Sequence, residues 1–144
     1  MKNNFASEYT QEVAIKAQYH DATDEQGREA ARAAYAAHAA RIEAKGESYA
    51  RLYSLFTEAQ ERGNERIDLH EVIWDNRVKP LIDSLREFGI EEFTFSSTWS
   101  SAVETAWLFL QNGCSLQGLI QINGQPNAFS GEPEKIPAYL FRLQ

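Results

Sequence analysis

The stretch from Phe93 to Trp107 constrains the fold of this chain more than any other part of the sequence. It begins as an apolar strand, continues through a run of hydroxyl side chains, and then has the pattern of an amphipathic helix. Five of the six residues from Ser96 to Ser101 have a hydroxyl group. They lie where the first backbone N–H groups of a helix lack intrahelical partners. A strand followed so closely by a helix indicates a chain that mixes the two elements.

The residues after Gly63 alternate between the periods of strands and helices. The expected elements are, in order, a strand at 65–69, a helix at 78–88, a strand at 91–95, a helix at 101–112, and strands at 115–122 and 138–143. This β-α-β-α-β-β order implies a small sheet with helices on one face. The helix-containing connections are expected to be parallel crossovers, and the last two strands are expected to be antiparallel.

Two details of this part of the chain are testable against a structure. In the helix at 101–112, we expect Ser101 and Glu104 to form a capping box. The buried stripe of this helix is expected to consist of Val103, Ala106, Trp107 and Leu110. After a turn at Asn123-Gly124, we expect a polar loop of about a dozen residues before the last strand.

The sequence before Gly63 has helical character throughout, with nine alanines between Ala30 and Ala44. We expect a short helix over residues 7–19 and a long helix over about 24–61, with Gly46 as its weak point. The chain is therefore expected to have an α+β fold, divided into a helical region, 1–63, and a sheet domain, 64–144. One stripe of the long helix is expected to pack within the chain, on a second copy or on a partner; it consists of Tyr35, His38, Ile42 and Tyr49.

Composition excludes several classes of protein. Hydrophobic residues make up 43% of the chain, which is enough for a packed core. The net charge of −7 argues against direct binding of nucleic-acid phosphates. Cys114 is the only cysteine, so neither an internal disulfide nor a cysteine-based zinc site is expected. We expect no cofactor, no metal and no membrane segment, and therefore an intracellular, soluble protein.

The hydroxyl-rich loop is the first candidate site. Hydroxyls and free N–H groups at a helix start serve as a helix cap, an anion site or a partner contact, and the sequence leaves these alternatives open. The loop lacks the glycines and the lysine of a P-loop and the flanking glycines of a nucleophile elbow, so no catalytic residue is predicted. The loop consists of Ser96, Ser97, Thr98, Trp99, Ser100 and Ser101.

Acidic residues form the second candidate site. Residues 64–144 contain 6 basic and 11 acidic residues, against 8 and 10 in residues 1–63. If the loop after Gly124 folds back, five glutamates are expected to gather on one rim and to attract a basic partner. These residues are Glu87, Glu91, Glu92, Glu132 and Glu134.

Residues 67–143 resemble a family of short acidic proteins from conjugative elements and phages of Gram-positive bacteria. The resemblance rests on Phe93–Ser97, Ser101–Trp107, Leu116–Asn123 and Pro137–Tyr139. Some proteins of this size and genomic setting are anti-CRISPR inhibitors of RNA-guided nucleases. The resemblance therefore implies a mobile-element protein that acts in the cytoplasm of a bacterial host, and it implies no catalytic residues.

The leading hypothesis is a non-enzymatic protein that inhibits a host defence nuclease or its guide complex by covering a basic groove. Its acidic residues would steer association, and Trp99 or the Tyr35/Tyr49 stripe would anchor it. One alternative is an enzyme acting on RNA or a phosphate ester through the hydroxyl loop, with Glu104 or His70 as acid or base. The other is a homo-oligomeric regulatory domain associated through its long helix.

Overall fold

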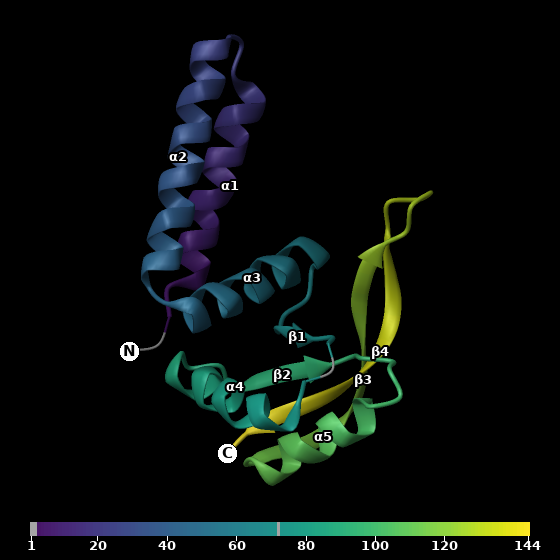
Figure 1. The fold of residues 1–144 in the computed structure, drawn as a ribbon. Coiled ribbons are helices and arrows are strands. Elements are labelled where there is room, and N and C mark those ends of the chain that lie inside the picture. Colours follow the sequence, from purple (N-terminus) through teal and green to yellow (C-terminus); the bar gives the residue numbers. More distant parts are fainter. Residues whose placement is uncertain (1–2, 72) are drawn as a thin grey trace. The chain divides into compact units, whose positions relative to one another are not determined.

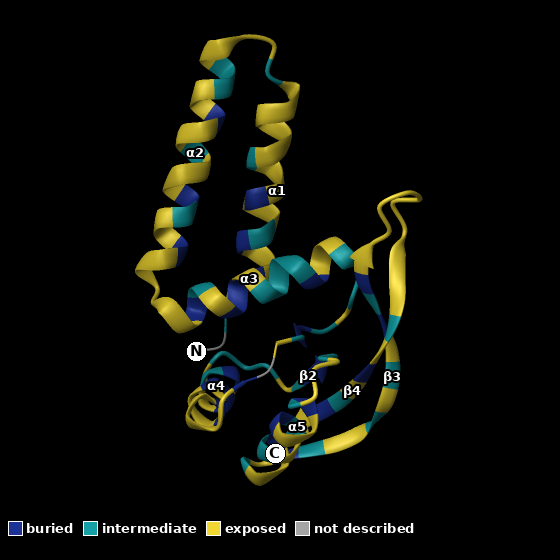
Figure 2. Cartoon of the chain, turned by 45° about the vertical axis from the view of Figure 1, so that its right-hand side comes forward, coloured by how far each residue is buried: buried dark blue, intermediate teal, exposed yellow. Residues whose placement is uncertain are grey.

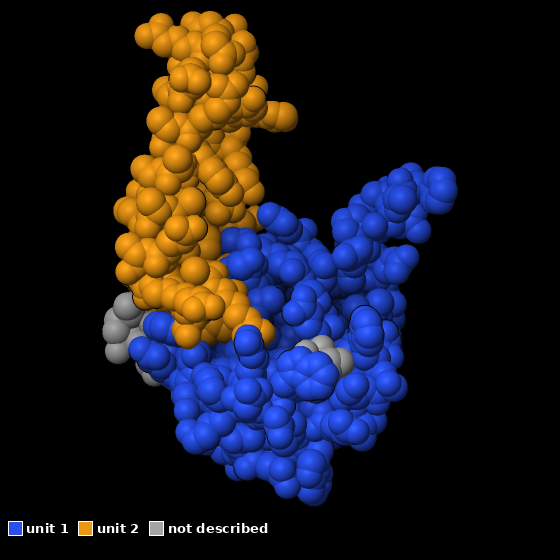
Figure 3. Space-filling model, in the orientation of Figure 1, with its two compact units in different colours: residues 1–2, 54–144 blue, residues 3–53 orange. Residues whose placement is uncertain are grey.

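The computed structural model describes residues 3–71 and 73–144, and it confirms the α+β fold. The described residues form two compact units, shown in different colours in Figure 3. We call residues 3–53 the helical unit and residues 54–144 the sheet unit. The two units meet within a helix, ten residues before the position at which the sequence placed a division.

The helical unit contains α1 (Phe5–Asp21), α2 (Glu25–Ala44) and the first half of α3 (Glu47–Arg62). Helices α1 and α2 form a hairpin (Figure 1). The cap of α2 is Asp24, whose side chain accepts a hydrogen bond from the backbone N–H of Gly27 at 2.7 Å.

The expected single helix over 24–61 is wrong, because the chain breaks between Ala44 and Glu47. Gly46 has a φ of +110°, a backbone conformation that side-chain-bearing residues rarely adopt. The break therefore occurs at the weak point that the sequence indicates, and it lets the chain turn into a separate helix.

The sheet unit contains β1 (Asp68–Leu69), α4 (Asp75–Glu87), β2 (Glu92–Phe95), α5 (Ala102–Gln111), β3 (Cys114–Pro126) and β4 (Pro133–Leu143). The predicted β-α-β-α-β-β order is confirmed. The strands lie in the order β1-β2-β4-β3, with β1 parallel to β2, and with β4 antiparallel to both β2 and β3. The first strand is shorter than the five residues expected.

Four phenylalanine rings form the core of the sheet unit. Phe109 of α5 packs with its ring centroid 5.1–5.3 Å from those of Phe93, Phe95 and Phe141. Helices α4 and α5 contact each other and lie on this side of the sheet (Figure 1). Each of the four rings is almost completely inaccessible to solvent, and burying a side chain of this size is the main favourable term in folding.

The expected polar loop after Asn123-Gly124 is wrong. The β3–β4 hairpin continues past this point to a Pro126–Pro133 pair, and a register shift lies between Asn123 and Pro126. This register shift is a β-bulge, and a residue outside the hairpin stabilises it. The side chain of Asn64 forms two 2.9 Å hydrogen bonds with the backbone of Asn123. Asn123-Gly124 is therefore a bulge rather than a turn.

Candidate functional site

Helix α5 turns an apolar stripe toward solvent. The exposed fractions are 73% for Trp99, 72% for Val103, 59% for Trp107 and 40% for Leu110. These positions are spaced by four, four and three residues, so they lie along one side of the helix and the turn that precedes it. We call these four residues the α5 face. In Figure 2, α5 has exposed and buried sides.

The structure thereby corrects the predicted orientation of α5. The buried stripe consists of Ala102, Thr105 and Phe109, whereas Val103, Trp107 and Leu110 were expected to be buried. Thr105 fixes this orientation, because its hydroxyl lies 3.3–3.4 Å from the backbone N and O of Ile73.

The apolar surface continues onto the sheet. Leu116 pairs with Phe141, and Leu119 pairs with Tyr139, so both leucines lie on the side of the sheet that α5 covers. Leu119 is 67% exposed, and Leu116 and Tyr139 are also exposed. An exposed Trp or Leu is unremarkable singly, but an exposed stripe of several on one side marks an interaction surface.

All three tryptophans of the sequence are exposed, since Trp74 also has an exposed fraction of 72%. Tryptophan is normally well buried, and where it is exposed it is one of the residues most enriched in binding hot spots. All three lie in the sheet unit. This unit therefore leaves its most interaction-prone side chains accessible.

The hydroxyl-rich loop is divided between two environments. Ser96 lies at the end of β2, where its hydroxyl donates a 2.5 Å hydrogen bond to Asp68. Thr94 donates to the same carboxylate at 2.7 Å. Burial raises the pKa of Asp68, although these two hydrogen bonds act in the opposite direction. Ser96 therefore helps to satisfy a buried carboxylate.

The rest of the loop leads into α5. The hydroxyl of Ser97 accepts a 3.3 Å hydrogen bond from the backbone N–H of Trp99, while Thr98, Trp99 and Ser100 are exposed. Ser101 is the N-cap, but its side chain makes no capping hydrogen bond, so the predicted capping box with Glu104 is wrong. Of the loop residues, Trp99 is the large apolar side chain that faces solvent.

The predicted acidic rim is separated into two groups. Glu92 of β2 lies opposite Arg142 of β4 in the strand register, and Glu91 and Glu87 are close to Glu92 in the chain. Glu132 and Glu134 lie at the other end of β4, about 25 Å away along the strand. The hairpin extends away instead of folding back, so the five glutamates do not form one rim.

The predicted helical interface lies largely inside the helical unit. His38, Ile42 and Tyr49 are buried, and Tyr35 is 44% exposed. Arg41 donates to Nδ1 of His38 at 3.1 Å, so Nε2 has the hydrogen and donates to the hydroxyl of Tyr53 at 3.2 Å. Of the alternatives for this stripe, packing within the chain fits these three residues.

The residues of the enzyme hypothesis have separate surroundings. His70 Nε2 lies 2.9 Å from Glu58 Oε1, and Glu104 is exposed on α5. Cys114 is buried, and burial raises its pKa to about 11, which disfavours the reactive thiolate.

Across residues 3–71 and 73–144, no group of three or more His, Cys, Asp or Glu side chains is arranged to hold a metal ion. Within the same residues, no helix is both long and apolar enough to cross a bilayer.

Most of this chain matches a known protein family. A family described as a domain of unknown function, DUF7698, matches residues 51–143. The chain belongs to this family. The match spans the sheet unit, including the α5 face, and starts within α3. No curated protein and no solved structure matches the chain.

Proposed function

We propose that this DUF7698 protein is a non-enzymatic binding protein whose sheet unit docks on another protein through the α5 face. The observation that supports this most directly is the exposed stripe of Trp99, Val103, Trp107 and Leu110. Aromatic anchors surrounded by smaller apolar side chains are the usual composition of an interface core. Helix α5 rests on a rigid phenylalanine core, so the stripe is held in place before binding.

The charge of the sheet unit defines the chemistry of the partner. Residues 54–144 have 13 acidic and 7 basic side chains, and Glu104 is exposed on α5 itself. Negative potential repels nucleic-acid phosphates and speeds encounter with a basic protein. The partner is therefore a protein with an apolar pocket in a basic surface.

We further propose that this partner is a nuclease of a bacterial defence system, bound by a protein of a mobile element. This narrower proposal rests on the resemblance of residues 67–143 to short acidic proteins of conjugative elements and phages, and on the negative charge. RNA-guided nucleases contain a basic channel for their heteroduplex, and an acidic protein that covers it would block access.

The experiment measures binding and inhibition separately. A purified RNA-guided nuclease loaded with guide RNA is titrated with this protein at low salt, and both the dissociation constant and DNA cleavage are followed. We expect inhibition that weakens as salt is added. Trp107→Ala is expected to weaken binding by roughly thirtyfold or more, as for a hot-spot residue.

Trp74→Ala is the matched control, since Trp74 is 72% exposed, against 59% for Trp107, but lies outside the α5 face. Equal binding by wild type and Trp107→Ala would overturn the α5 face as the docking surface. If no nuclease binds, but another basic protein binds to the α5 face, the proposal of a nuclease partner fails and the α5 face remains the docking surface. Self-association that Trp107→Ala abolishes would mean that the α5 face binds a second copy of this chain, which would overturn docking on a different protein.

The enzyme alternative also remains a prediction, and one contact is relevant to it. Ser96 donates its hydroxyl hydrogen to a carboxylate, which is the arrangement of a nucleophile beside a base. Phosphoesterase or RNase activity that His70→Ala or Glu104→Ala removes would support an enzyme and contradict the binding proposal.

A further inference from the structure

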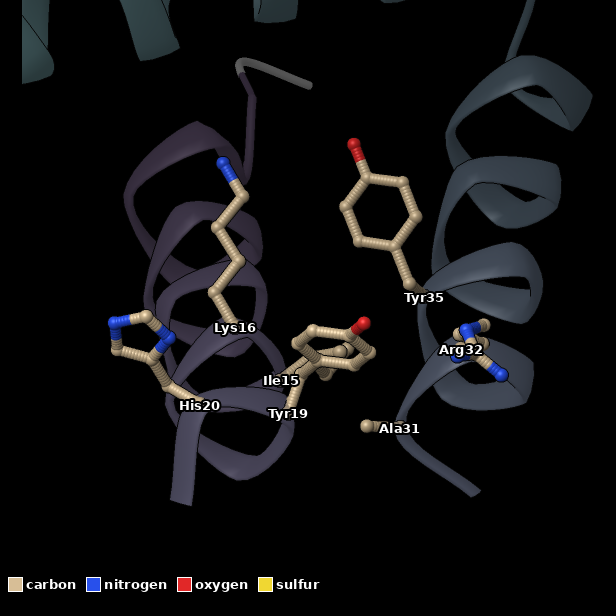
Figure 4. Close-up of a pocket in the computed structure, with 7 residues that line it drawn as sticks. All are labelled: Ile15, Lys16, Tyr19, His20, Ala31, Arg32 and Tyr35. Atoms are coloured by element: carbon tan, nitrogen blue, oxygen red, sulfur yellow. The ribbon is translucent and has the colours of Figure 1, made fainter. Parts of the chain in front are cut away.

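The helical unit contains a cavity that is independent of the α5 face. It has a volume of about 390 Å³ and lies between α1 and α2 (Figure 4). Ile15, Lys16, Tyr19 and His20 line it from α1. All residues around it belong to the helical unit. A cavity of this volume falls in the range of small-molecule sites.

Two tyrosine rings from different helices define the interior. Tyr19 of α1 and Tyr35 of α2 both point into the gap between the helices in Figure 4. Ile15 and Ala31 supply the aliphatic part of the wall. A planar aromatic or aliphatic group would contact rings and methyl groups here.

The rim of this cavity is basic. Lys16 and Arg32 are among the lining residues, and the lining includes no acidic side chain. The guanidinium of Arg32 lies 5.6 Å from the centroid of the Tyr19 ring, so one cation is already placed over the aromatic wall. An anionic group on a bound molecule would meet these cations.

Both cations have acidic partners within the helical unit, and the partners of Arg32 are exposed whereas the partner of Lys16 is buried. Arg32 lies 3.0 Å from Glu25 and 3.0 Å from Glu29, and Lys16 lies 3.2 Å from Glu12. Side chains of Lys16 and Arg32 are about half exposed. The Arg32 pairs are exposed on both sides and contribute little to stability, so Arg32 can exchange Glu25 and Glu29 for a ligand anion. Lys16 can donate to an anion while it stays close to Glu12, because an ammonium group has three donors.

We propose that this cavity, which we call the α1–α2 pocket, binds a small molecule with an aromatic or aliphatic body and one anionic group. The body lies between Tyr19 and Tyr35, and the anion contacts Arg32 and Lys16. The inference does not depend on the α5 face, because the two sites lie in different units.

The test uses 2-naphthoate as the anionic probe and 2-naphthalenemethanol as its neutral analogue. Methyl resonances of Ile15 and Ala31 are followed by NMR during each titration, since both side chains line the pocket. We expect saturable shifts at both methyls with naphthoate. Arg32→Gln with Lys16→Gln is expected to weaken naphthoate about fivefold and to leave the neutral analogue unchanged.

Tyr35→Ala tests the aromatic wall, and Tyr139→Ala in the sheet unit is its control. Tyr35 and Tyr139 are similarly exposed, so neither change is expected to unfold the protein, and circular dichroism verifies this. Weaker binding of both probes by Tyr35→Ala alone supports the proposal. Absence of saturable shifts at Ile15 and Ala31, or equal affinity in every variant, overturns it. If the Ile15 and Ala31 methyl resonances shifted with protein concentration in the absence of any probe, a second copy of the chain would occupy the pocket. That result would also overturn the proposal.

Discussion

The helical unit and the sheet unit differ in how far charged side chains contribute to their interiors. In the helical unit, Glu8, Glu12 and His38 are buried beside Phe5 and the tyrosines. Glu8 is paired with Lys45 at 2.8 Å, and this hydrogen bond raises the pKa of Lys45. Around α5 in the sheet unit, by contrast, four phenylalanine rings form most of the interior, and the buried polar side chain of α5 is the uncharged Thr105.

This difference separates two sources of stability. An apolar core gains free energy in proportion to the area that it buries, and it tolerates changes of charge elsewhere. A buried polar network stabilises a fold only while each of its members is satisfied, so one missing hydroxyl has a large effect. The sheet unit also has apolar side chains beyond those in its core, and the α5 face consists of these.

The largest expected effect is that of Phe109→Ala. Phe109 packs against three other rings, so its removal is expected to destabilise the sheet unit by about 3–5 kcal/mol. Urea unfolding measures the loss, and hydrogen exchange locates it. Trp107→Ala, two positions earlier on the same helix, is the control and is expected to change stability by at most about 0.5 kcal/mol. Similar losses in both variants would mean that Trp107 is not exposed.

Tyr53→Phe tests the polar network of the helical unit. The Tyr53 hydroxyl donates to Glu12 at 3.2 Å and accepts from His38, and desolvation raises the pKa of this phenol well above its ordinary value. Its loss is expected to cost about 1–3 kcal/mol, since two buried groups then lose a partner. Amides of α1 and α2 should exchange faster, while those of the sheet unit stay protected. Tyr139→Phe serves as the comparison, and equal stability of the two variants would contradict the network.

Gly46→Ala tests the break between α2 and α3. A φ of +110° strains any residue with a Cβ, so we expect a loss of about 1–2 kcal/mol although the space around Gly46 is open. Thermal unfolding followed by circular dichroism measures it. Glu47→Ala at the next position is expected to cost at most about 0.5 kcal/mol. A more stable Gly46→Ala variant would mean that the two helices can merge into one.

The smallest effect is expected for Asp68→Asn, and it concerns pH. Burial raises the folded-state pKa of Asp68 above its ordinary value of 3.8. Over the interval above that value, the folded chain retains a proton that the unfolded chain has lost, so this group makes stability fall as pH rises. Asp68→Asn should remove that fall, as measured by urea unfolding between pH about 4 and about 7. Asp83 is exposed, so the control variant Asp83→Asn should keep the same fall in the free energy of unfolding as pH rises. If the free energy of unfolding of Asp68→Asn still fell with pH as in the wild type, this account would be contradicted.

Much of the fold could be predicted from local pattern. The order of strands and helices after Gly63 follows from periodicity. Gly46 was identified as the weak point of the long helix. In each case neighbouring residues in the chain determine the outcome, through backbone conformation or alternation of side chains.

Helix α5 shows why the candidate site could not be predicted. Its sequence is apolar on most sides, so the stripe of Val103, Trp107 and Leu110 and the stripe of Ala102, Thr105 and Phe109 fit helical periodicity equally well. Trp99 was expected to serve as an anchor, but the exposure of Trp74 and Trp107 had no signal in the sequence. The same limitation applies to the five glutamates, since their separation depends on how far the β3–β4 hairpin extends.

The sequence by itself determined that this chain mixes helices with a small sheet, where its helices break, and that its net charge is negative, because propensity, periodicity and charge are local or additive properties. Tertiary structure alone decided which side of α5 faces solvent and that His38 lies within a polar network. It also decided that Tyr19 and Tyr35, from different helices, line one pocket. The physical reason is that burial is a property of contacts between segments far apart in the chain, and three phenylalanines of the sheet accommodate Phe109 rather than Trp107.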